Sequence, residues 1–241
     1  MRSSRPSRAP VVPTLAVGIG LAGLAAAPAG AADAKHPTVI ELFQSQGCSS
    51  CPPANANLIE ISAREDVLAL NFAVDYWDRL GWKDTFARPE FTARQWAYAR
   101  AMGHGEVYTP QIVVNGRVDG VGAQAGEMRE LAQRADRGAA GPELALEPGA
   151  VAIGAAQAPW RGADVWLARY EPRVIDVPIL RGENAGRTLP HKNVVREMTL
   201  IGHWSGEAER LFLPPASQSG LADAVLVQTS GAGPILAAAK D

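Results

Sequence analysis

The chain has 241 residues, of which 47% are hydrophobic and 20% are charged, and its formal net charge at pH 7 is -2. Because the charges nearly balance and no basic stripe is interleaved with aromatic residues, nucleic acid is excluded as an expected partner. A chain of this length can form one large or two small domains, each with its own hydrophobic core, and it leaves the oligomeric state open.

A secretory signal peptide is predicted for residues 1–32. Three arginines within the first eight residues precede an apolar stretch, 11–27, which is followed by small residues at 29–31 that suit cleavage. A spanning helix needs ~20 apolar residues, more than this stretch provides, although an uncleaved anchor stays an alternative. We therefore expect a periplasmic or secreted bacterial protein, with no membrane contact after cleavage, in a compartment where disulfides persist.

The first domain is expected at residues 33–137, with the element order β-α-β-α-β-β-α. A near-continuous apolar run, 67–74, is typical of a strand that is buried in a parallel sheet. An Asn115-Gly116 pair between two short apolar segments predicts a β-hairpin. The expected elements lie, in chain order, at 38–43, 53–63, 67–74, 89–103, 111–114, 117–121 and 125–135.

The two cysteines of the chain, Cys48 and Cys51, are separated by two serines and lie between the first expected strand and the first expected helix. In an exported protein, this spacing indicates thiol redox chemistry. A helix N-terminus stabilises a thiolate, so we expect Cys48, on the loop side, to be the exposed attacking thiol. Cys51 is then expected to be more buried and to resolve the mixed disulfide. The alternative is a structural bridge, but closing so short a loop contributes only about 2 kcal/mol in the loop-entropy model.

Metal binding is another use of two cysteines. A structural zinc site needs four ligands, and none of the four histidines stands at a ligand-like spacing from the pair. Two thiolates suffice for a soft ion such as Cu(I), so a copper-handling role stays open. The prediction from the sequence is that the protein holds no metal and no cofactor.

The order of the elements, with the two cysteines after the first strand and Thr109-Pro110 before the third, resembles the thioredoxin fold. The resemblance implies a cis Pro110 that faces the two cysteines, whereas a proline placed at the start of a strand is the alternative. It also implies a role for Glu41, because thioredoxins carry a buried acid on the corresponding strand. A buried carboxylate has a raised pKa and can accept a proton, but Glu41 could equally lie on a solvated strand face.

Longer motifs resemble one bacterial family more closely. The matching segments are Glu41–Pro53, Val74–Asp78, Leu80–Asp84, Tyr108–Gln111, Arg181–Arg187 and Asn193–Arg196. They are similar to the secreted bacterial family known as domain of unknown function 1223, and the resemblance covers essentially the whole mature chain. It implies a fold and a candidate site, and it leaves the activity and the substrate open.

A loop rich in aromatic residues, 75–84, follows the second expected strand at its carboxyl end. Open α/β sheets place their binding sites at this edge, and the two cysteines are expected at the same edge. The side chains expected to wall a cleft around the cysteines and to contact a partner are Asp75, Tyr76, Trp77, Trp82 and Thr109. The alternative is a hydrophobic cluster packed beneath a long loop.

The composition changes after residue 137, and residues 138–143 are predicted to be a linker. Short apolar segments at regular spacing in residues 144–241 predict a mostly antiparallel β-sandwich-like domain that packs against the first. A polar segment of this domain could bind an anion or a partner, or form a structural network between the domains. Its candidate residues are Arg181, Glu183, Asn184, Arg187, His191, Asn193 and Arg196.

The expected fold class is therefore α/β, with a thioredoxin-like domain followed by a β-rich domain. The function we predict is that of an extracytoplasmic thiol–disulfide oxidoreductase, with a thiol or disulfide protein as its partner and Cys48 and Cys51 as the reactive pair. The alternative is a non-enzymatic module in which the thioredoxin-like fold is a scaffold that holds a ligand or a metal ion.

Overall fold

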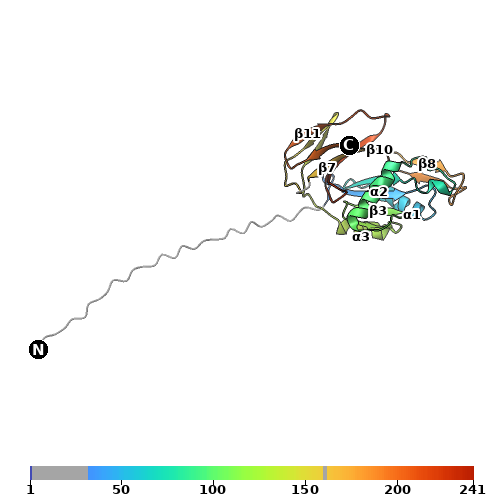
Figure 1. The fold of residues 1–241 in the computed structure, drawn as a ribbon, viewed down its shortest axis with the longest axis horizontal. Coiled ribbons are helices and arrows are strands. Elements are labelled where there is room, and N and C mark those ends of the chain that lie inside the picture. Colours follow the sequence, from blue (N-terminus) through green and yellow to red (C-terminus); the bar gives the residue numbers. More distant parts are fainter. Residues whose placement is uncertain (2–31, 160–161) are drawn as a thin grey trace.

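The structure is a computed structural model that describes Met1 and residues 32–159 and 162–241 (Figure 1). The predicted signal peptide, apart from its two end residues, lies outside the described residues. In the part of the chain that is described, no helix has the length and apolar character needed to cross a membrane. The described residues form a mixed α/β fold that is built on one large sheet.

Within residues 32–137, the described chain forms four strands and three α-helices. Their bounds are β1 (Thr38–Gln44), α1 (Cys51–Ile61), β2 (Val67–Ala73), α2 (Pro89–Met102), β3 (Gln111–Val114), β4 (Val118–Gly120) and α3 (Ala125–Arg134), with a short 3-10 helix, η1 (Asp78–Leu80), before α2. Helix α1 begins at Cys51, earlier than the predicted Pro53. Pro52 and Pro53 fit its first turn because the N–H groups there have no intrahelical acceptor, so a missing N–H costs little.

The described residues of the second half, 138–159 and 162–241, form strands and loops. The strands are β5 (Leu144–Glu147), β6 (Ala150–Ile153), β7 (Ala163–Glu171), β8 (Ile175–Pro178), β9 (Thr188–His191), β10 (Val194–Trp204), β11 (Glu209–Phe212), β12 (Ala222–Thr229) and β13 (Ile235–Lys240). β8 and β9 pair with each other as a separate hairpin, and β11, β6 and β5 form a small antiparallel sheet. In Figure 1, β8 lies at the same end of the molecule as α1, and β11 lies at the opposite end.

The described strands form a central sheet of eight strands in the order β13-β12-β7-β10-β2-β1-β3-β4. β1 runs parallel to β2 and antiparallel to β3, so the sheet is mixed. Hydrophobic side chains of α1 and α3 pack on one face of β1 and β2, and those of α2 pack on the other face. Because both faces are covered, every residue of β1 and β2 is buried.

The second half does not form a separate layer against the first, because four of its strands continue the same sheet. β10 runs parallel to β2 where Val194 lies beside Asn71. The backbone N–H of Asn71 donates a 2.9 Å hydrogen bond to the carbonyl oxygen of Asn193, and the Asn193 amide donates a 2.8 Å bond to that of Ala69. Strand spacing in a sequence shows where strands lie but not which sheet they join, so the sequence does not predict that β10 pairs with β2.

One part of the second half has two layers, as a sandwich-like arrangement requires. The small sheet β11-β6-β5 packs against β7, β12 and β13 through buried residues such as Val151 and Val227. A different hydrophobic core lies on the α2 face of the large sheet. It contains Phe43 and Phe72 from the first half and Leu226 from the second, so the two halves share it.

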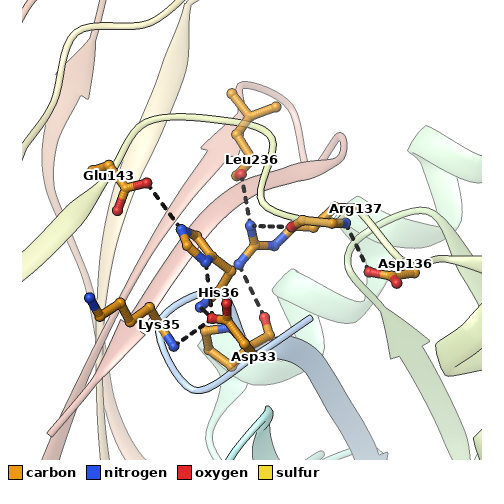
Figure 2. A network of polar contacts seen from close by, with 9 residues as sticks. Asp33, Lys35, His36, Asp136, Arg137, Glu143 and Leu236 are labelled. Atoms are coloured by element: carbon orange, nitrogen blue, oxygen red, sulfur yellow. Dashed lines mark hydrogen bonds and ion pairs between the residues drawn. The ribbon is translucent and has the colours of Figure 1, made fainter. Parts of the chain in front are cut away.

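Polar contacts hold the chain where the two halves meet, as Figure 2 shows. Arg137 is buried, and its guanidinium donates hydrogen bonds to the carbonyl oxygens of Pro37 at 3.1 Å and Leu236 at 3.3 Å. Nearby, the ring of His36 lies 3.1 Å from a carboxylate oxygen of Glu143. The predicted linker is therefore fastened at both ends, since Arg137 just before it contacts both halves and Glu143 at its end contacts His36.

Candidate functional site

The two cysteines form a disulfide at the carboxyl end of β1, in the turn that leads into α1. Their Cα atoms are 5.5 Å apart; Cys48 lies before the helix and Cys51 is its first residue. Cys48 is 0% exposed and Cys51 is 1% exposed. The prediction that Cys48 is an exposed thiol is therefore wrong, because other parts of the chain cover both cysteines, although Ser49 and Ser50 between them are exposed.

The loop between β8 and β9, called here the β8–β9 loop, provides one part of the cover. Asn184 is fully buried, and its side-chain amide donates 2.9 Å hydrogen bonds to the carbonyl oxygens of Gln46 and Cys48. Glu183 accepts a 3.0 Å hydrogen bond from the backbone N–H of Ser49. Hydrogen bonds with the side chain and backbone of Ser49 lower the pKa of the Glu183 carboxyl. The polar segment of the second half thus contributes directly to the surroundings of the disulfide.

The Thr109-Pro110 segment lies on another side of the disulfide turn. The peptide bond between these residues is cis, as predicted, and Pro110 is buried. The hydroxyl of Ser50 lies 3.3 Å from Cys48 Sγ and donates a 3.4 Å hydrogen bond to the carbonyl oxygen of Thr109. Ser50 therefore connects the disulfide turn to the Thr109-Pro110 segment.

The aromatic loop of residues 75–84 packs onto the disulfide turn. Trp77 Nε1 donates a 2.8 Å hydrogen bond to Thr109 Oγ1, and Trp82 Nε1 donates a 2.9 Å bond to Gln46 Oε1. Both indoles are thus anchored to residues that flank the disulfide. This arrangement agrees with the alternative prediction for this loop, a hydrophobic cluster packed beneath it, better than with an open cleft.

Two further residues predicted for a partner cleft fasten the start of the aromatic loop. The backbone N–H of Asp75 donates a 3.1 Å hydrogen bond to Thr92 Oγ1, and the Thr92 hydroxyl donates a 2.6 Å bond to Asp75 Oδ1. Tyr76 is partly buried against the core on the α2 face, and this burial raises the pKa of its hydroxyl. Asp75 is therefore bound to α2, and Tyr76 is packed on the same side of the sheet.

Asp84 is a buried polar residue that the sequence does not mark out. Its side chain is 3% exposed, and its carboxylate accepts hydrogen bonds from the backbone N–H groups of Gln46 at 2.7 Å and Phe86 at 2.8 Å. Burial raises the pKa of Asp84 to about 6. In the sequence it stands in a polar stretch of a loop, where no periodicity indicates burial. It holds the aromatic loop to the strand end that carries the disulfide.

Glu41 lies on the face of the sheet that α2 covers, whereas α1 covers the other face. Its carboxylate is 0% exposed and accepts hydrogen bonds from the Arg94 guanidinium at 2.7 and 3.1 Å, and another from the Tyr98 hydroxyl. The same guanidinium donates a 3.1 Å bond to Gln228 Oε1. The role of proton acceptor for the cysteines, which the resemblance to thioredoxins implies for Glu41, does not fit this position.

A cavity of about 340 Å³ lies next to the disulfide, between α1 and β9. It is lined by the end of β1, by residues of α1 between Cys51 and Ala56, and by residues 187–191. Cys51 is among the lining residues, and Cys48 is not. The disulfide therefore borders the cavity on its Cys51 side.

His191 lines this cavity, and neither of its ring nitrogens has a hydrogen-bond partner among the described residues. The residue is 1% exposed, and the ring of Phe86 meets its ring edge-on with 5.7 Å between centroids. Burial lowers the pKa of His191 to about 4, so the imidazole is neutral at pH 7. Buried polar groups without partners are rare in native proteins, so His191 is a candidate contact for a ligand in the cavity.

The other predicted residues of the polar segment occupy separate positions. Arg187 is exposed at the rim of the cavity and donates a 2.7 Å hydrogen bond to Asn184 Oδ1. Asn193 joins β10 to β2, as the expected structural network between the halves requires. The guanidinium of Arg196 stacks on a neighbouring phenyl ring at 4.9 Å, and Arg181 is exposed.

Fold and site together define a mixed α/β protein with a buried CxxC disulfide beside a small cavity. Within the described ranges 32–159 and 162–241, no group of three or more histidine, cysteine, aspartate or glutamate side chains is placed to hold one metal ion. The chain belongs to the family described as protein of unknown function DUF1223, whose model matches residues 39–228.

Two solved structures are similar to this chain. The X-ray crystal structure of a protein from Agrobacterium tumefaciens has 32% sequence identity and a TM-score of 0.70, and the match covers 84% of this chain and 92% of that one. HBP35 of Porphyromonas gingivalis has 13% identity and a TM-score of 0.58, over 86% of this chain and 75% of that one, a likeness of fold alone. No curated protein matches the chain.

Proposed function

We propose that the protein is an extracytoplasmic thiol–disulfide oxidoreductase with a thioredoxin-like first half, and that Cys48 and Cys51 are its reactive pair. The observation that carries the proposal is the position of the disulfide at the carboxyl end of β1, at the head of α1 and beside a cavity. Sites of open α/β sheets lie at this edge. A redox-active pair needs this combination of a fixed position and an adjacent space for a substrate.

A purely structural role accounts poorly for this bond. The disulfide turn is already closed by a backbone hydrogen bond of 3.3 Å from Cys51 to Cys48. In the loop-entropy model, so short a loop contributes only about 2 kcal/mol, against about 3 kcal/mol for a loop of roughly 15 residues. The stabilisation is small, whereas the spacing suits two thiols that close on each other during exchange.

The proposed reaction is thiol–disulfide exchange. In the reductive direction, one thiolate of the pair attacks a sulfur of the substrate disulfide R–S–S–R, and one R–S⁻ leaves. The second thiolate attacks the protein sulfur of the mixed disulfide, the other R–S⁻ leaves and the bond between Cys48 and Cys51 forms. Two electrons and two protons pass from the pair to the two released thiols. The reverse sequence oxidises two substrate thiols and leaves the pair reduced.

The proposed compartment is the periplasm or the exterior of a bacterial cell. Support comes from the N-terminal sequence, in which a basic start precedes an apolar stretch and small residues. A disulfide persists in such a compartment, where thiols are not kept reduced by the cytosolic systems. The partner in the exchange is then a thiol or disulfide present outside the cytoplasm.

Exchange with a model disulfide tests the proposal. The protein is reduced, freed of reductant and mixed with oxidised glutathione, and the released thiols are measured over time. We expect about one substrate disulfide to be consumed per protein molecule, with return of the Cys48–Cys51 bond. A double variant, Cys48→Ser with Cys51→Ser, is the control and should consume none. Equal results for the unaltered protein and the double variant would show the proposal to be wrong.

A non-enzymatic binding module is the second candidate, and the burial of both cysteines favours it. In that case the cavity between α1 and β9 holds a ligand, and the disulfide only shapes its wall. Re-formation of the bond by oxidised glutathione does not by itself separate the two functions, because a reduced structural pair also closes by exchange. Ease of reduction separates them, because the disulfide of a binding module would resist mild reductant as long as the protein stays folded.

A further inference from the structure

We propose that Cys51, and not Cys48, is the sulfur that exchanges with the substrate, and that the substrate is a low-molecular-weight disulfide bearing a carboxylate, bound in the cavity between α1 and β9. This assignment rests on the proposed function and specifies its substrate class. It reverses the roles that the sequence predicts for the two cysteines.

The surroundings of the two cysteines decide which sulfur a substrate reaches first. Both cysteines are buried, with Cys48 0% and Cys51 1% exposed, but Cys51 is among the residues that line the cavity and Cys48 is not. The β8–β9 loop also binds the backbone at Cys48: Asn184 donates a hydrogen bond to the carbonyl oxygen of Cys48, and Glu183 accepts one from the backbone N–H of Ser49. Cys51 is the first residue of α1, so the positive end of the helix macrodipole favours its thiolate at least as well as that of Cys48, which lies before the helix. A substrate in the cavity therefore meets Cys51.

The size of the cavity indicates a small substrate. A volume of about 340 Å³ lies near the lower end of the range for small-molecule sites, which is roughly 300–1,000 Å³. A protein partner that binds stably covers a much broader surface, about 800 Å² on each side. The β8–β9 loop lies over the disulfide turn and is bonded to it. The cavity thus fits one arm of a small disulfide better than the surface of a protein.

Two polar side chains of the cavity define the chemistry that it can bind. Among the described residues, the Arg187 guanidinium donates a hydrogen bond to Asn184 and forms no ion pair with a carboxylate. Its remaining N–H groups can pair with a substrate carboxylate. His191 is 1% exposed with two unpartnered ring nitrogens. A neutral imidazole can donate one hydrogen bond and accept another, so the ring can bind a further polar group of the substrate once a small shift of the ring exposes one of its buried nitrogens to the cavity.

The first step is an attack by the Cys51 thiolate on the nearer sulfur of the bound R–S–S–R. The bond between the two substrate sulfurs breaks, a carboxylate-bearing R–S⁻ leaves, and a new bond joins Cys51 Sγ to the other R–S group. The Cys48 thiolate then attacks Cys51 Sγ and releases the second R–S⁻. One disulfide is reduced while one forms, and the substrate is the only oxidant.

Single-cysteine variants identify the exchanging sulfur. Cys48→Ser keeps only Cys51, and Cys51→Ser keeps only Cys48. Each variant is mixed with dithiodipropionate, a small disulfide with a carboxylate on each arm, and the mixed disulfide is followed by mass spectrometry. We expect the adduct to form about tenfold faster on Cys48→Ser than on Cys51→Ser. The unaltered reduced protein gives a second readout that needs no variant: limiting iodoacetamide should label Cys51 before Cys48.

Matched probes test the substrate class. Cystamine resembles dithiodipropionate in length but carries amines in place of carboxylates. In the Cys48→Ser background, Arg187→Gln should lower the ratio of the dithiodipropionate rate to the cystamine rate by about fivefold. Arg181→Gln is the control, because Arg181 is exposed in the same β8–β9 loop and does not line the cavity. His191→Phe, which keeps a ring beside Phe86, should slow dithiodipropionate by about fivefold.

The outcomes separate this assignment from the proposed function. If the adduct forms faster on Cys51→Ser, or if Arg187→Gln leaves the ratio of rates unchanged, the assignment is wrong while the protein still exchanges disulfides. If neither cysteine forms an adduct with dithiodipropionate, cystamine or oxidised glutathione, the proposed function fails together with the assignment.

Discussion

The side-chain amide of Asn184 donates a 2.9 Å hydrogen bond to the carbonyl oxygen of Cys48, although 136 positions of the sequence separate the two residues. The same amide donates a second 2.9 Å bond, to the carbonyl oxygen of Gln46, and the residue is 0% exposed. The β8–β9 loop is thus fastened to the disulfide turn. Since any opening of the turn on this side breaks these bonds, we expect the second half of the chain to limit access to the disulfide.

Replacing Asn184 with alanine leaves two buried carbonyl oxygens without these donors. We expect Asn184→Ala to lower the free energy of unfolding by about 1–3 kcal/mol, as measured by denaturant unfolding. It should also speed the reduction of the Cys48–Cys51 bond by dithiothreitol, as measured by timed thiol counting. Arg181→Ala, on the exposed side of the same loop, should change neither quantity. An unchanged reduction rate in Asn184→Ala would contradict the role of the β8–β9 loop as a cover.

Replacing His191 with phenylalanine removes two buried nitrogens without partners and should raise the unfolding free energy at neutral pH by about 1 kcal/mol. Burial lowers the native pKa of His191 to about 4 from 6.5, so the unfolded state binds the proton first on acidification. The free energy of unfolding is therefore highest above pH 6.5, and protonation of His191 in the unfolded state lowers it as the pH falls towards 4, by about 3 kcal/mol. In denaturant unfolding, His191→Phe should lack this loss. An equal loss in both proteins would assign it to another group.

The raised pKa of Asp84 predicts the opposite dependence of the unfolding free energy on pH. Burial raises its native pKa to about 6 from 3.8, so the native state holds the proton more tightly than the unfolded state does. The resulting stabilisation is full below pH 3.8 and is lost as the pH rises through 6, by about 3 kcal/mol. Asp84→Asn stays neutral at every pH, so its unfolding free energy should lack this fall. Persistence of the fall in Asp84→Asn would rule out Asp84 as its source.

Arg94 is the counter-ion of the buried Glu41 carboxylate, and removing it leaves a charge without a partner. We expect Arg94→Met to lower the free energy of unfolding by about 3–5 kcal/mol. The double variant, Arg94→Met with Glu41→Leu, removes both charges and should recover a large part of this loss in denaturant unfolding. Because Glu41 lies on the α2 face, Glu41→Gln should leave the pH profile of cysteine alkylation unchanged. A shifted profile would restore Glu41 as a proton acceptor for the pair.

Local patterns in the sequence predict the parts of the site that neighbouring residues determine. The apolar run 67–74 becomes β2, and the Asn115-Gly116 pair becomes the turn between β3 and β4. Cys48 lies between β1 and α1 and Cys51 begins α1, close to where the patterning of the flanking segments puts them. In each case the pattern extends over only a few neighbouring residues, so a short stretch of sequence is enough to predict the element.

Long-range contacts are what the sequence does not reveal. The partner of Glu41 is Arg94, 53 positions away, and a strand pattern cannot show which face of a sheet a helix will cover. Asn184 and His191 belong to a polar segment that comes just before β10, the strand that pairs with β2. The cover over Cys48 therefore becomes visible only once the whole sheet is assembled.

The reduction potential of the Cys48–Cys51 bond tests the central claim of thiol–disulfide exchange most directly. The protein is equilibrated in glutathione buffers of graded composition, and the reduced fraction is measured by alkylation and mass spectrometry. We predict a potential within the range of exchange-active proteins, about -270 to -120 mV. A potential below about -300 mV, typical of structural disulfides, would contradict the claim and leave the pair as a structural bridge.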